Sequence, residues 1–289
     1  MTRVGAVFSP YDNAPEALRD AVAVCEAEGV PELWLWEDCF RESAYASVAA
    51  ALAWSTELRV GLGISPFPLR NVTVTAMEIA TIEWMFPGRF YPGLGHGVLP
   101  WMEQAGVRAA SPLTLMREYL PALRSLLAGE EVTTSGRYVT LDRVRLDWPP
   151  ETPPPIYSAG EGPKTLALTG EIADGTILVG GLTPAEISER IELVRQGQAA
   201  ANHAEATTIV AYVTAAFGDG AEDRVRAELA QSGIDVDDRG FWGDPEDVAL
   251  ALRRFADAGA DALILQPPTG EPDLHGFLRA VAEVARLLA

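Results

Sequence analysis

The sequence predicts a (β/α)₈ barrel, the TIM-barrel fold class, as a single domain of 289 residues. Two observations support this prediction. Eight short apolar segments alternate with helical segments along the chain. The apolar segments lack a polar alternate face, which is typical of parallel strands that are buried on both sides. A doubly wound open sheet is the alternative that the same alternation allows.

The first half of the chain contains four strand–helix pairs, and local signals mark their ends. Asn13, with Glu16 three residues later, forms a capping-box pattern at the start of the first helix, and Gly29 stops that helix. Ser43 is expected to cap the second helix. Pro92 weakens the fourth strand, because proline has no N–H to donate. The strands are expected at residues 3–8, 33–36, 58–64 and 89–94, and the helices at residues 13–29, 43–54, 71–86 and 113–127.

Residues 129–155 interrupt this alternation and are expected to be an insertion into the barrel. Two short alternating segments, at 138–141 and 144–146, are expected to pair as a hairpin. The run 148–155 contains five prolines and is therefore stiff and extended. The insertion is expected to return the chain to the fifth strand rather than to link two domains.

The second half of the chain resumes the alternation. Thr183 and Glu186 flank a proline at the first helical position, which is a strong start signal for the sixth helix. Asp244 starts a later helix by the same chemistry, after an acidic loop. The strands are expected at residues 156–159, 175–179, 207–216 and 262–265, and the helices at 163–172, from 183, at 219–230, from 244 and at 274–288.

The overall composition excludes several classes of partner. The formal net charge is −19, whereas nucleic acids and anionic membranes are bound through basic patches. No apolar run approaches the roughly 18 residues of a membrane span, and the first residues lead into a strand with no signal-peptide pattern. The chain has only two cysteines, Cys25 and Cys39, and they form no recognisable sequence pattern, which indicates reduced thiols. We therefore expect a cytoplasmic protein whose partner is a small molecule.

Two acidic residues after the second strand are candidates for proton transfer. The working face of a barrel lies at the carboxyl ends of its strands. Glu37 and Asp38 follow strand two directly, and one of them could act as a general acid or hydrogen-bond a ring. Solvated loop acids are the alternative that the residues leave open.

A histidine and a tryptophan follow the fourth strand. His96 lies between Gly95 and Gly97 at a strand end, where a catalytic role and a structural role are both compatible with the sequence. Trp101, beyond this loop, could cover a flat ligand or belong to the core. The histidines show no metal-binding spacing, so no metal is expected. They are His96, His203 and His275.

A glycine-rich loop before the fifth helix is the best candidate for an anion site. Small residues let backbone N–H groups approach a phosphate, and the start of a helix carries unpaired donors and partial positive charge. Lys164 adds a full charge there. Tight turns are the structural alternative for these glycines. The candidates are Ala159, Gly160, Gly162, Pro163, Lys164 and Thr165, with Gly180 and Gly181 in the next loop.

Glycines also lie near the ends of the third and fourth strands. Glycine in a strand marks a bulge or a place where a ligand approaches the backbone. Gly63, followed by Ile64 and Ser65, is one such place, and the loop of Gly95 is the other. Two such places on neighbouring parallel strands suit a flat ligand.

Three blocks of the sequence, taken together, resemble a known family. They are LWLWEDCF, VGLGISPFPLRNVTVTAMEIATIEWMFPGRFYPGLGHGVLPW and IYSAGEGPKTLALTGEIADGTILVGG. In this order they resemble the luciferase-like flavin-dependent oxidoreductases. The resemblance is greatest to the branch that uses the deazaflavin coenzyme F420 and is similar to methylenetetrahydromethanopterin reductase. The matching blocks lie within residues 3–183.

The resemblance implies a barrel that forms a homodimer through the helices after strands two and three. It implies coenzyme F420 with its ring against a bulge that contains a non-prolyl cis peptide, here at Gly63-Ile64. The phosphate would lie at the loop of Lys164. The implied reaction is hydride transfer between C5 of the coenzyme and an organic substrate. In that reaction the proton donor or acceptor would be Glu37, Asp38 or His96.

Three other functions are compatible with these residues. A reduced-FMN-dependent monooxygenase has the same fold, and a non-catalytic flavin-binding protein would bind a flavin without turnover. A phosphosugar-type barrel enzyme would bind its substrate at the loop of Lys164. The side chains expected above the ring indicate only a partly apolar substrate. They are Phe67, Leu69, Leu99 and Trp101.

Overall fold

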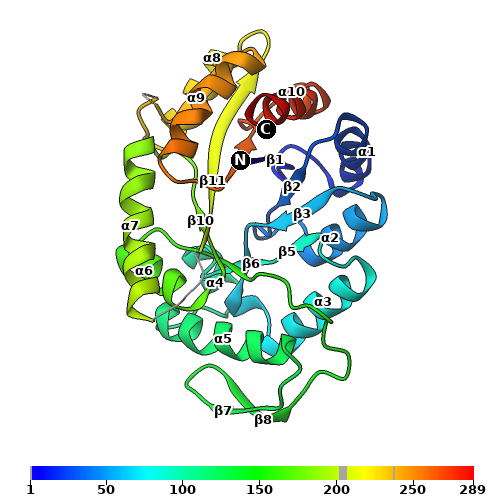
Figure 1. Ribbon diagram of the computed structural model, residues 1–289, viewed down its shortest axis with the longest axis vertical. Helices are drawn as coiled ribbons and strands as arrows, with labels where there is room; N and C mark the ends of the chain where they lie inside the picture. The colour runs from blue at the N-terminus through cyan, green and yellow to red at the C-terminus, as the bar shows by residue number, and fades with distance from the viewer. Residues whose placement is uncertain (1, 202–206, 237) are drawn as a thin grey trace.

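Eight parallel strand positions form a ring, with helices around the outside (Figure 1). The computed structural model describes residues 2–201, 207–236 and 238–289. In chain order, the ring consists of β1 (Arg3–Val7), β2 (Glu32–Leu35), β3 (Arg59–Leu62) with β4 (Ser65–Pro66), β5 (Phe90–Tyr91) with β6 (Gly93–Gly95), β9 (Tyr157–Ala159), β10 (Gly175–Leu178), β11 (Thr208–Phe217) and β13 (Ala262–Gln266).

The ring closes because its third and fourth positions each consist of two segments. β3 pairs with β5, and β4 pairs with β6, which in turn pairs with β9. Elsewhere in the ring, β1 lies between β13 and β2. All these pairings are parallel, as in other barrels of this class. The predicted (β/α)₈ barrel is therefore confirmed, and the open doubly wound sheet is excluded.

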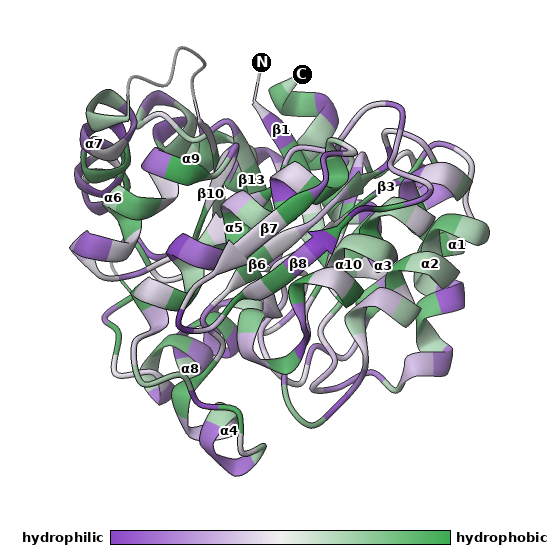
Figure 2. Ribbon diagram, turned by 90° about the horizontal axis from the view of Figure 1, so that it is seen from below, coloured by the Kyte–Doolittle hydropathy of each residue, from purple (hydrophilic) through white to green (hydrophobic). Residues whose placement is uncertain are grey.

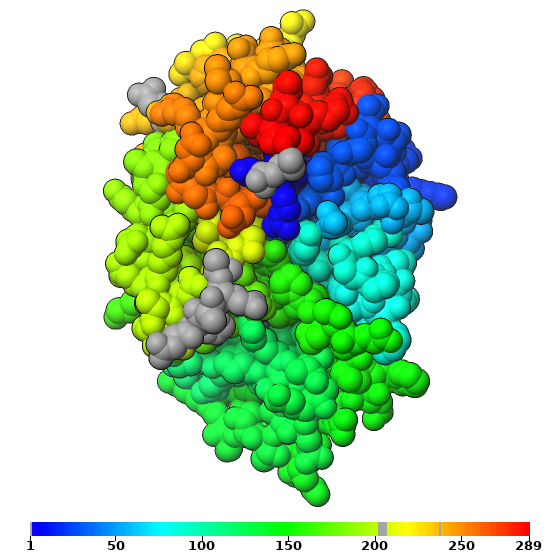
Figure 3. Space-filling view, viewed as in Figure 1, coloured from blue at the N-terminus to red at the C-terminus, as the bar shows by residue number. Residues whose placement is uncertain are grey.

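The outer layer consists of helices that connect successive strands. Figure 3 shows this succession from the face where β1 begins, with the chain colours following one another around the start of β1. The helix α10 packs against α1, α9 and β1, so the last helix joins the first part of the chain. The helices are α1 (Leu18–Glu28), α2 (Ala44–Ala53), α3 (Val72–Met85), α4 (Leu99–Gln104), α5 (Pro112–Leu127), α6 (Pro163–Ile172), α7 (Pro184–Ala200), α8 (Ala221–Gln231), α9 (Pro245–Asp257) and α10 (Leu274–Leu288).

Large side chains and one ion pair fill the inside of the barrel. Trp34 meets the rings of Tyr157 and Tyr212 edge to face. Glu32, at the start of β2, is fully buried, which requires partners for its charge. It accepts a hydrogen bond from Nε1 of Trp34 at 3.0 Å and lies 3.3 Å from Nε of Arg3. This packed interior leaves the carboxyl ends of the strands as the place for a ligand.

Many of the predicted helix and strand ends are confirmed. The helix α6 occupies the predicted residues 163–172. Thr183 and Glu186 form the predicted capping box of α7, and Asp244 caps α9. Gly29 follows the end of α1 in the left-handed conformation, with φ 76°. Pro92 lies between β5 and β6, the two parts of the fourth strand, which agrees with the predicted weakening of this strand.

Two predicted side-chain caps do not form, although Ser43 does directly precede α2 as predicted. Asn13 and Glu16 make no capping box, because Nδ2 of Asn13 donates to the carbonyl oxygen of Ser9 at 2.9 Å and a 3₁₀ turn precedes α1. Ser43 is the N-cap residue of α2, but its side chain makes no capping hydrogen bond. The backbone N–H of α2 at residue 44 donates instead to Oε1 of Glu37, at 3.3 Å. A carboxylate from the end of β2 therefore caps α2.

Three elements differ from the sequence prediction. The hairpin in the insertion pairs β7 (Val132–Ser135) with β8 (Thr140–Val144), rather than segments 138–141 and 144–146. A further strand, β12 (Gly240–Gly243), pairs with the end of the ten-residue strand β11. The short helix α4 forms in a stretch that was predicted as a loop, and Figure 2 shows it at the lower edge of the molecule.

Both cysteines are free thiols. Cys25 is buried and Cys39 is partly exposed. In the part of the chain that the structure describes, no helix is long and apolar enough to cross a membrane. His203 lies outside the described residues.

Candidate active site

A cavity of about 500 Å³ lies at the carboxyl ends of the strands. This volume is within the range of small-molecule sites. The cavity brings together the residues that follow β2, β6 and β9, which are far apart in the sequence. The predicted site residues that line it are Glu37, Asp38, Gly63, Ile64, Gly95, His96, Gly97, Trp101, Ala159, Gly160, Gly162 and Thr165.

The apolar side chains that were expected above a ring are divided between two cavities. Leu99 and Trp101 line the cavity at the strand ends, as expected. The same expectation is wrong for Phe67 and Leu69, which line a separate cavity next to α5 and the hairpin. The predicted cofactor-binding residues outside the lining are Ser65, Pro163, Lys164, Gly180 and Gly181.

The peptide bond Gly63-Ile64 forms one wall of the cavity and is cis. This confirms the non-prolyl cis peptide that the family resemblance implied here. Gly63 has no room for a side chain, since a Cβ would lie 1.9 Å from the hydroxyl oxygen of Tyr212. Tyr212, on β11, is buried and donates to the carbonyl oxygen of Gly63 at 3.4 Å. A second non-prolyl cis bond, Cys39-Phe40, was not predicted.

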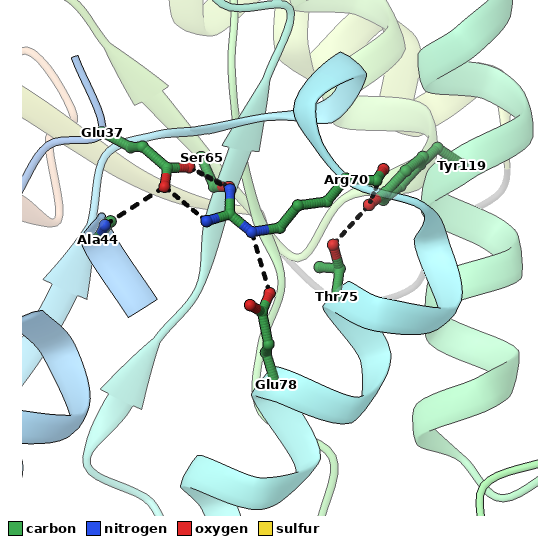
Figure 4. A network of polar contacts seen from close by, with 7 residues as sticks. All are labelled: Glu37, Ala44, Ser65, Arg70, Thr75, Glu78 and Tyr119. Atoms are coloured by element: carbon green, nitrogen blue, oxygen red, sulfur yellow. Dashed lines mark hydrogen bonds and ion pairs between the residues drawn. The ribbon is translucent and has the colours of Figure 1, made fainter. Parts of the chain in front are cut away.

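Glu37 is held on both carboxylate oxygens (Figure 4). Arg70 donates from Nη1 to Oε2 at 2.5 Å and from Nη2 to Oε1 at 2.7 Å. Oγ of Ser65 donates to Oε2 at 3.0 Å, in addition to the backbone N–H of Ala44 on Oε1. Because four donors meet two oxygens, this carboxylate functions as an acceptor. Glu37 thereby connects the end of β2 to β4 and to the start of α2.

Arg70 extends this network to two further helices (Figure 4). Its Nε lies 3.1 Å from Oε2 of Glu78 on α3, and its carbonyl oxygen accepts from the hydroxyl of Tyr119 on α5 at 3.2 Å. Its guanidinium lies 4.8 Å from the ring centroid of Tyr45 on α2. Sequence reasoning missed Arg70. The available signal was a single cation in the loop between the third strand and the third helix.

Asp38 has different surroundings from Glu37. The hydroxyl of Tyr11 donates to Oδ2 of Asp38 at 2.8 Å, and the guanidinium of Arg41 lies 3.9 Å from the Tyr11 ring centroid. Burial raises the pKa of Asp38, although Tyr11 and Arg41 act in the opposite direction. Burial, together with the hydrogen bond to Asp38, raises the pKa of Tyr11 to about 12. Asp38 therefore keeps its proton to a higher pH than a free aspartate, which suits a general acid.

His96 lines the cavity with an unsatisfied ring. Its Nδ1 and Nε2 are both buried, and neither has a hydrogen-bond partner among the described residues. Buried polar atoms without a partner are rare in folded proteins, so these nitrogens are candidates for contact with a ligand. Burial lowers the pKa of His96, and the neutral imidazole offers one donor and one acceptor. Among the described residues, no group of three His, Cys, Asp or Glu side chains could hold a metal ion.

The start of α6 lies beside the cavity and is open. Gly162 is its N-cap and provides no side-chain cap, and Pro163 is its first residue. Lys164, the single lysine of the chain, is exposed and makes no ion pair with a described residue. A Cβ at Gly160 would lie 2.6 Å from Cγ2 of Thr165, so the tight approach of the loop to the helix requires glycine. The start of α6 has the backbone donors that an anion needs, and Lys164 adds a positive charge nearby, outside the cavity lining.

The loop after β10 contributes two glycines with different constraints. A Cβ at Gly180 would come no closer than 3.5 Å to another atom, Oε1 of Gln266, so packing does not require glycine there. Gly181 has a left-handed backbone with φ 77°, which favours glycine. The backbone conformation therefore favours glycine at position 181, whereas a Cβ at Gly180 would make only ordinary van der Waals contacts.

Comparisons with known proteins agree with this arrangement. A family model described as "Luciferase-like monooxygenase" matches residues 2–233. The chain is similar to 5,10-methylenetetrahydromethanopterin reductase of Methanolobus tindarius, with 26% identity over 193 residues, which cover 67% of this chain and 58% of that protein. The match thus spans less than two thirds of the relative's length.

Two solved structures share the fold. An F420-dependent secondary alcohol dehydrogenase in complex with an F420-acetone adduct has a TM-score of 0.87 and 21% identity, with 100% of this chain and 99% of that chain covered. The oxygenating constituent of 3,6-diketocamphane monooxygenase from Pseudomonas putida, in complex with FMN, has a TM-score of 0.81 and 15% identity, with 100% and 98% covered. At these identities the likeness concerns the fold.

Proposed function

This chain belongs to the luciferase-like monooxygenase family, and from that premise we propose that it is an oxidoreductase that uses coenzyme F420 and a small organic substrate. The methylenetetrahydromethanopterin reductase and the F420-dependent alcohol dehydrogenase named above support the deazaflavin over other flavins. The observation that carries the proposal is a single cavity whose lining joins Gly63 and Ile64 to Gly162 and Thr165 at the open start of α6.

The residues present fit such a cofactor. Gly63 and Gly95 line the cavity, and glycine in a strand marks a place where a ligand can approach the backbone. The uncapped start of α6 and the charge of Lys164 suit a phosphate. The residues that would hold the ring are Gly63, Ile64, Ser65, Gly95 and Gly97, and those that would hold the phosphate are Ala159, Gly160, Gly162, Pro163, Lys164, Thr165, Gly180 and Gly181.

The side chains around the ring site have distinct proposed tasks. When bound, coenzyme F420 supplies hydride transfer at its C5, which is chemistry that the protein itself lacks. Asp38 holds and releases the proton that accompanies this transfer, since burial raises the pKa of its carboxyl group. His96 hydrogen-bonds the substrate through a ring nitrogen. Glu37 is a positioning residue, because Arg70 and Ser65 already occupy its oxygens. Trp101 covers the substrate from α4.

A binding titration tests the choice of cofactor. The purified protein is titrated with F420 and with FMN, and binding is followed by quenching of their fluorescence. We expect F420 to bind with a micromolar Kd. FMN should bind at least about tenfold more weakly. The variant Lys164→Ala should weaken F420 binding by about tenfold, which is about 1.4 kcal/mol. Arg137→Ala, an exposed cation on the hairpin loop, is the control and should bind like the unchanged protein.

A reduced-FMN monooxygenase is the second candidate. The structural likeness to the FMN-bound oxygenating constituent favours it. Tight FMN binding with no measurable F420 binding would select this candidate. Binding of either cofactor without turnover over a panel of organic substrates would favour a non-catalytic flavin-binding protein.

We also propose that two copies of the chain form a homodimer through α2 and α3. Large apolar side chains are exposed along α3, and Trp54 at the end of α2 is exposed as well. An exposed apolar face of this kind marks an interaction surface. The exposed residues on α3 are Val74, Met77, Trp84 and Met85. The cytoplasm is the proposed location, in keeping with the free thiols.

A further inference from the structure

The charged groups that line the active-site cavity are all acidic. Glu37, Asp38 and Glu161 are in its wall, and no arginine or lysine is among the described residues that line it. Lys164 lies outside the lining, on the first turn of α6. A negatively charged substrate would therefore meet carboxylates and no cation.

The two acids nearest the ring site already accept hydrogen bonds from neighbouring side chains. Both oxygens of Glu37 accept from the guanidinium of Arg70, whose Nε also pairs with Glu78. Asp38 accepts a hydrogen bond from the hydroxyl of Tyr11. The guanidinium of Arg41 lies over the ring of the same Tyr11. Neither carboxylate is left as a free counter-ion for a positively charged substrate.

The third acid does not change this balance. Glu161 is exposed to solvent at the loop before α6, where water screens its charge. The remaining wall near α4 and β10 is apolar, and it consists of Ile64, Leu99, Trp101, Ile177 and Val179. An ion that enters this part of the cavity loses hydration and finds no partner of opposite charge.

His96 supplies the polar contact that this wall otherwise lacks. Both ring nitrogens are buried and free of partners among the described residues. Burial lowers the pKa of His96, so the ring is neutral near pH 7. A neutral imidazole can donate one hydrogen bond and accept another. It therefore suits a hydroxyl, carbonyl or amide group and not an ion.

We propose that the substrate end of this cavity selects uncharged, partly apolar molecules with one polar group that His96 hydrogen-bonds. This inference rests on the proposed function, since it concerns the substrate of the same site. It divides the cavity into two parts. The end at Lys164 and α6 binds an anion, and the end at His96 and α4 rejects charge of either sign.

Three probes of similar size and different charge test this selection. Benzyl alcohol is uncharged, benzoate is an anion and benzylammonium is a cation at pH 7. Each is titrated by calorimetry into cofactor-loaded protein. We expect benzyl alcohol to bind at least about tenfold more tightly than either ion. The proposal is overturned if benzoate or benzylammonium binds as tightly as benzyl alcohol, or if benzyl alcohol does not bind.

Two variants locate the selection in the cavity wall. Leu99→Arg places a cation in the lining at a position that is already half exposed, so it should fold and should bind benzoate about tenfold more tightly than the unchanged protein does. His96→Phe should lose the preference for benzyl alcohol. His275→Phe, on α10 and outside the cavity, is the matched control and should keep that preference.

The outcome is separable from that of the proposed function. Loading is read from the absorbance of F420, or of FMN where F420 does not bind, before any probe is added. A failure to bind F420 contradicts the proposed cofactor. Unchanged benzoate binding in Leu99→Arg, together with an unchanged probe order in His96→Phe, contradicts the charge selection whichever cofactor is bound.

Discussion

Glu37 and Asp38 are neighbours in the chain, but their side chains have opposite surroundings. Glu37 accepts from four donors, including two from Arg70. Asp38 accepts from the neutral hydroxyl of Tyr11, and burial raises its pKa. The oxygens of Glu37 are occupied by donors, whereas burial lets Asp38 keep its proton to a higher pH than a free aspartate. The pair therefore separates naturally into a positioning residue and a proton carrier.

The pH dependence of turnover tests the role of Asp38. Because its pKa is raised in the folded protein, Asp38 is protonated at low pH and loses its proton as the pH rises through that raised pKa. A rate that needs this proton should fall on the same rise in pH. Asp38→Asn should remove this limb of the kcat profile and lower kcat by about 100-fold or more.

Asp142→Asn, at an exposed site on β8, is the control for this experiment. It should leave both kcat and the shape of the profile unchanged. If Asp38→Asn retains the full rate and the same pH limb, another group carries the proton.

The ion pair of Arg70 and Glu37 should contribute strongly to stability. Arg70→Met leaves the largely buried carboxylate of Glu37 without its charge partner, which costs about 3–5 kcal/mol of unfolding free energy. Urea denaturation followed by circular dichroism measures the change. Arg117→Met removes an exposed pair with Glu171 and should cost less than about 1 kcal/mol. Equal losses in the two variants would show that burial of the Arg70 pair has no special weight.

Site residues carried by local motifs could be predicted, and those that depend on distant contacts could not. His96 and Gly160 follow strand ends and line the cavity, as predicted. Tyr11, Arg70 and Tyr212 were missed, because their partners are 27, 33 and 149 residues away in the sequence. Tyr212, within an apolar strand, resembles an ordinary core residue until Gly63 is seen beside it.

At the scale of helices, cap chemistry predicted a helix start correctly where the capping side chain and the N–H group that donates to it are local. Thr183 accepts from the backbone N–H of Glu186 at 3.3 Å, and Glu186 accepts from that of Thr183 at 2.8 Å. Ser43 has the right residue type and position but makes no capping hydrogen bond, since Glu37 takes that task from another element. Sequence preference alone does not reveal such a replacement.

A matched pair of substitutions tests this difference. Thr183→Ala should lower the free energy of unfolding by about 1 kcal/mol, because it removes an N-cap hydrogen bond. Ser43→Ala should change it by only a few tenths of a kcal/mol, since its side chain makes no capping hydrogen bond. Urea unfolding of both variants measures the effect. A larger loss for Ser43→Ala than for Thr183→Ala would contradict the assignment of the caps.

Elements outside the regular alternation were the hardest to predict. The strand β12 is four residues long, contains two glycines and is recognisable only through its pairing with β11. The six-residue helix α4 lies within a glycine-rich stretch and was predicted as a loop. Short segments of this kind form because a neighbour supplies their hydrogen bonds or packing, which local propensity does not record.

At the scale of the whole molecule, the barrel could be predicted because its signal repeats along the chain. Each apolar strand followed by a helix supports the same architecture, so errors in single ends do not matter. The closure of the ring through the split third and fourth strands is a tertiary feature. Pro92 indicated only that the fourth strand is weakened, and it did not reveal which neighbours each half would pair with.

The proposed dimer face can be tested by adding one charge. Met77 is 59% exposed on α3, and a glutamate there would place a charge in an apolar interface. Met77→Glu should weaken dimerisation by about 100-fold, as measured by sedimentation velocity at several concentrations. Leu250→Glu is the control, because Leu250 is 64% exposed on α9, away from that face. A dimer that survives Met77→Glu and dissociates with Leu250→Glu would contradict the proposed face.

The chain has a net charge of −19 and a single lysine, and the central claim places that lysine at the cofactor's phosphate. Acetylation of Lys164, followed by mass spectrometry, reports directly on this contact. At about ten times its Kd, F420 should slow acetylation about tenfold, because only about one-tenth of the protein remains free. The deazaflavin core without phosphate should bind without protecting Lys164. An unchanged acetylation rate with F420 bound would contradict the account.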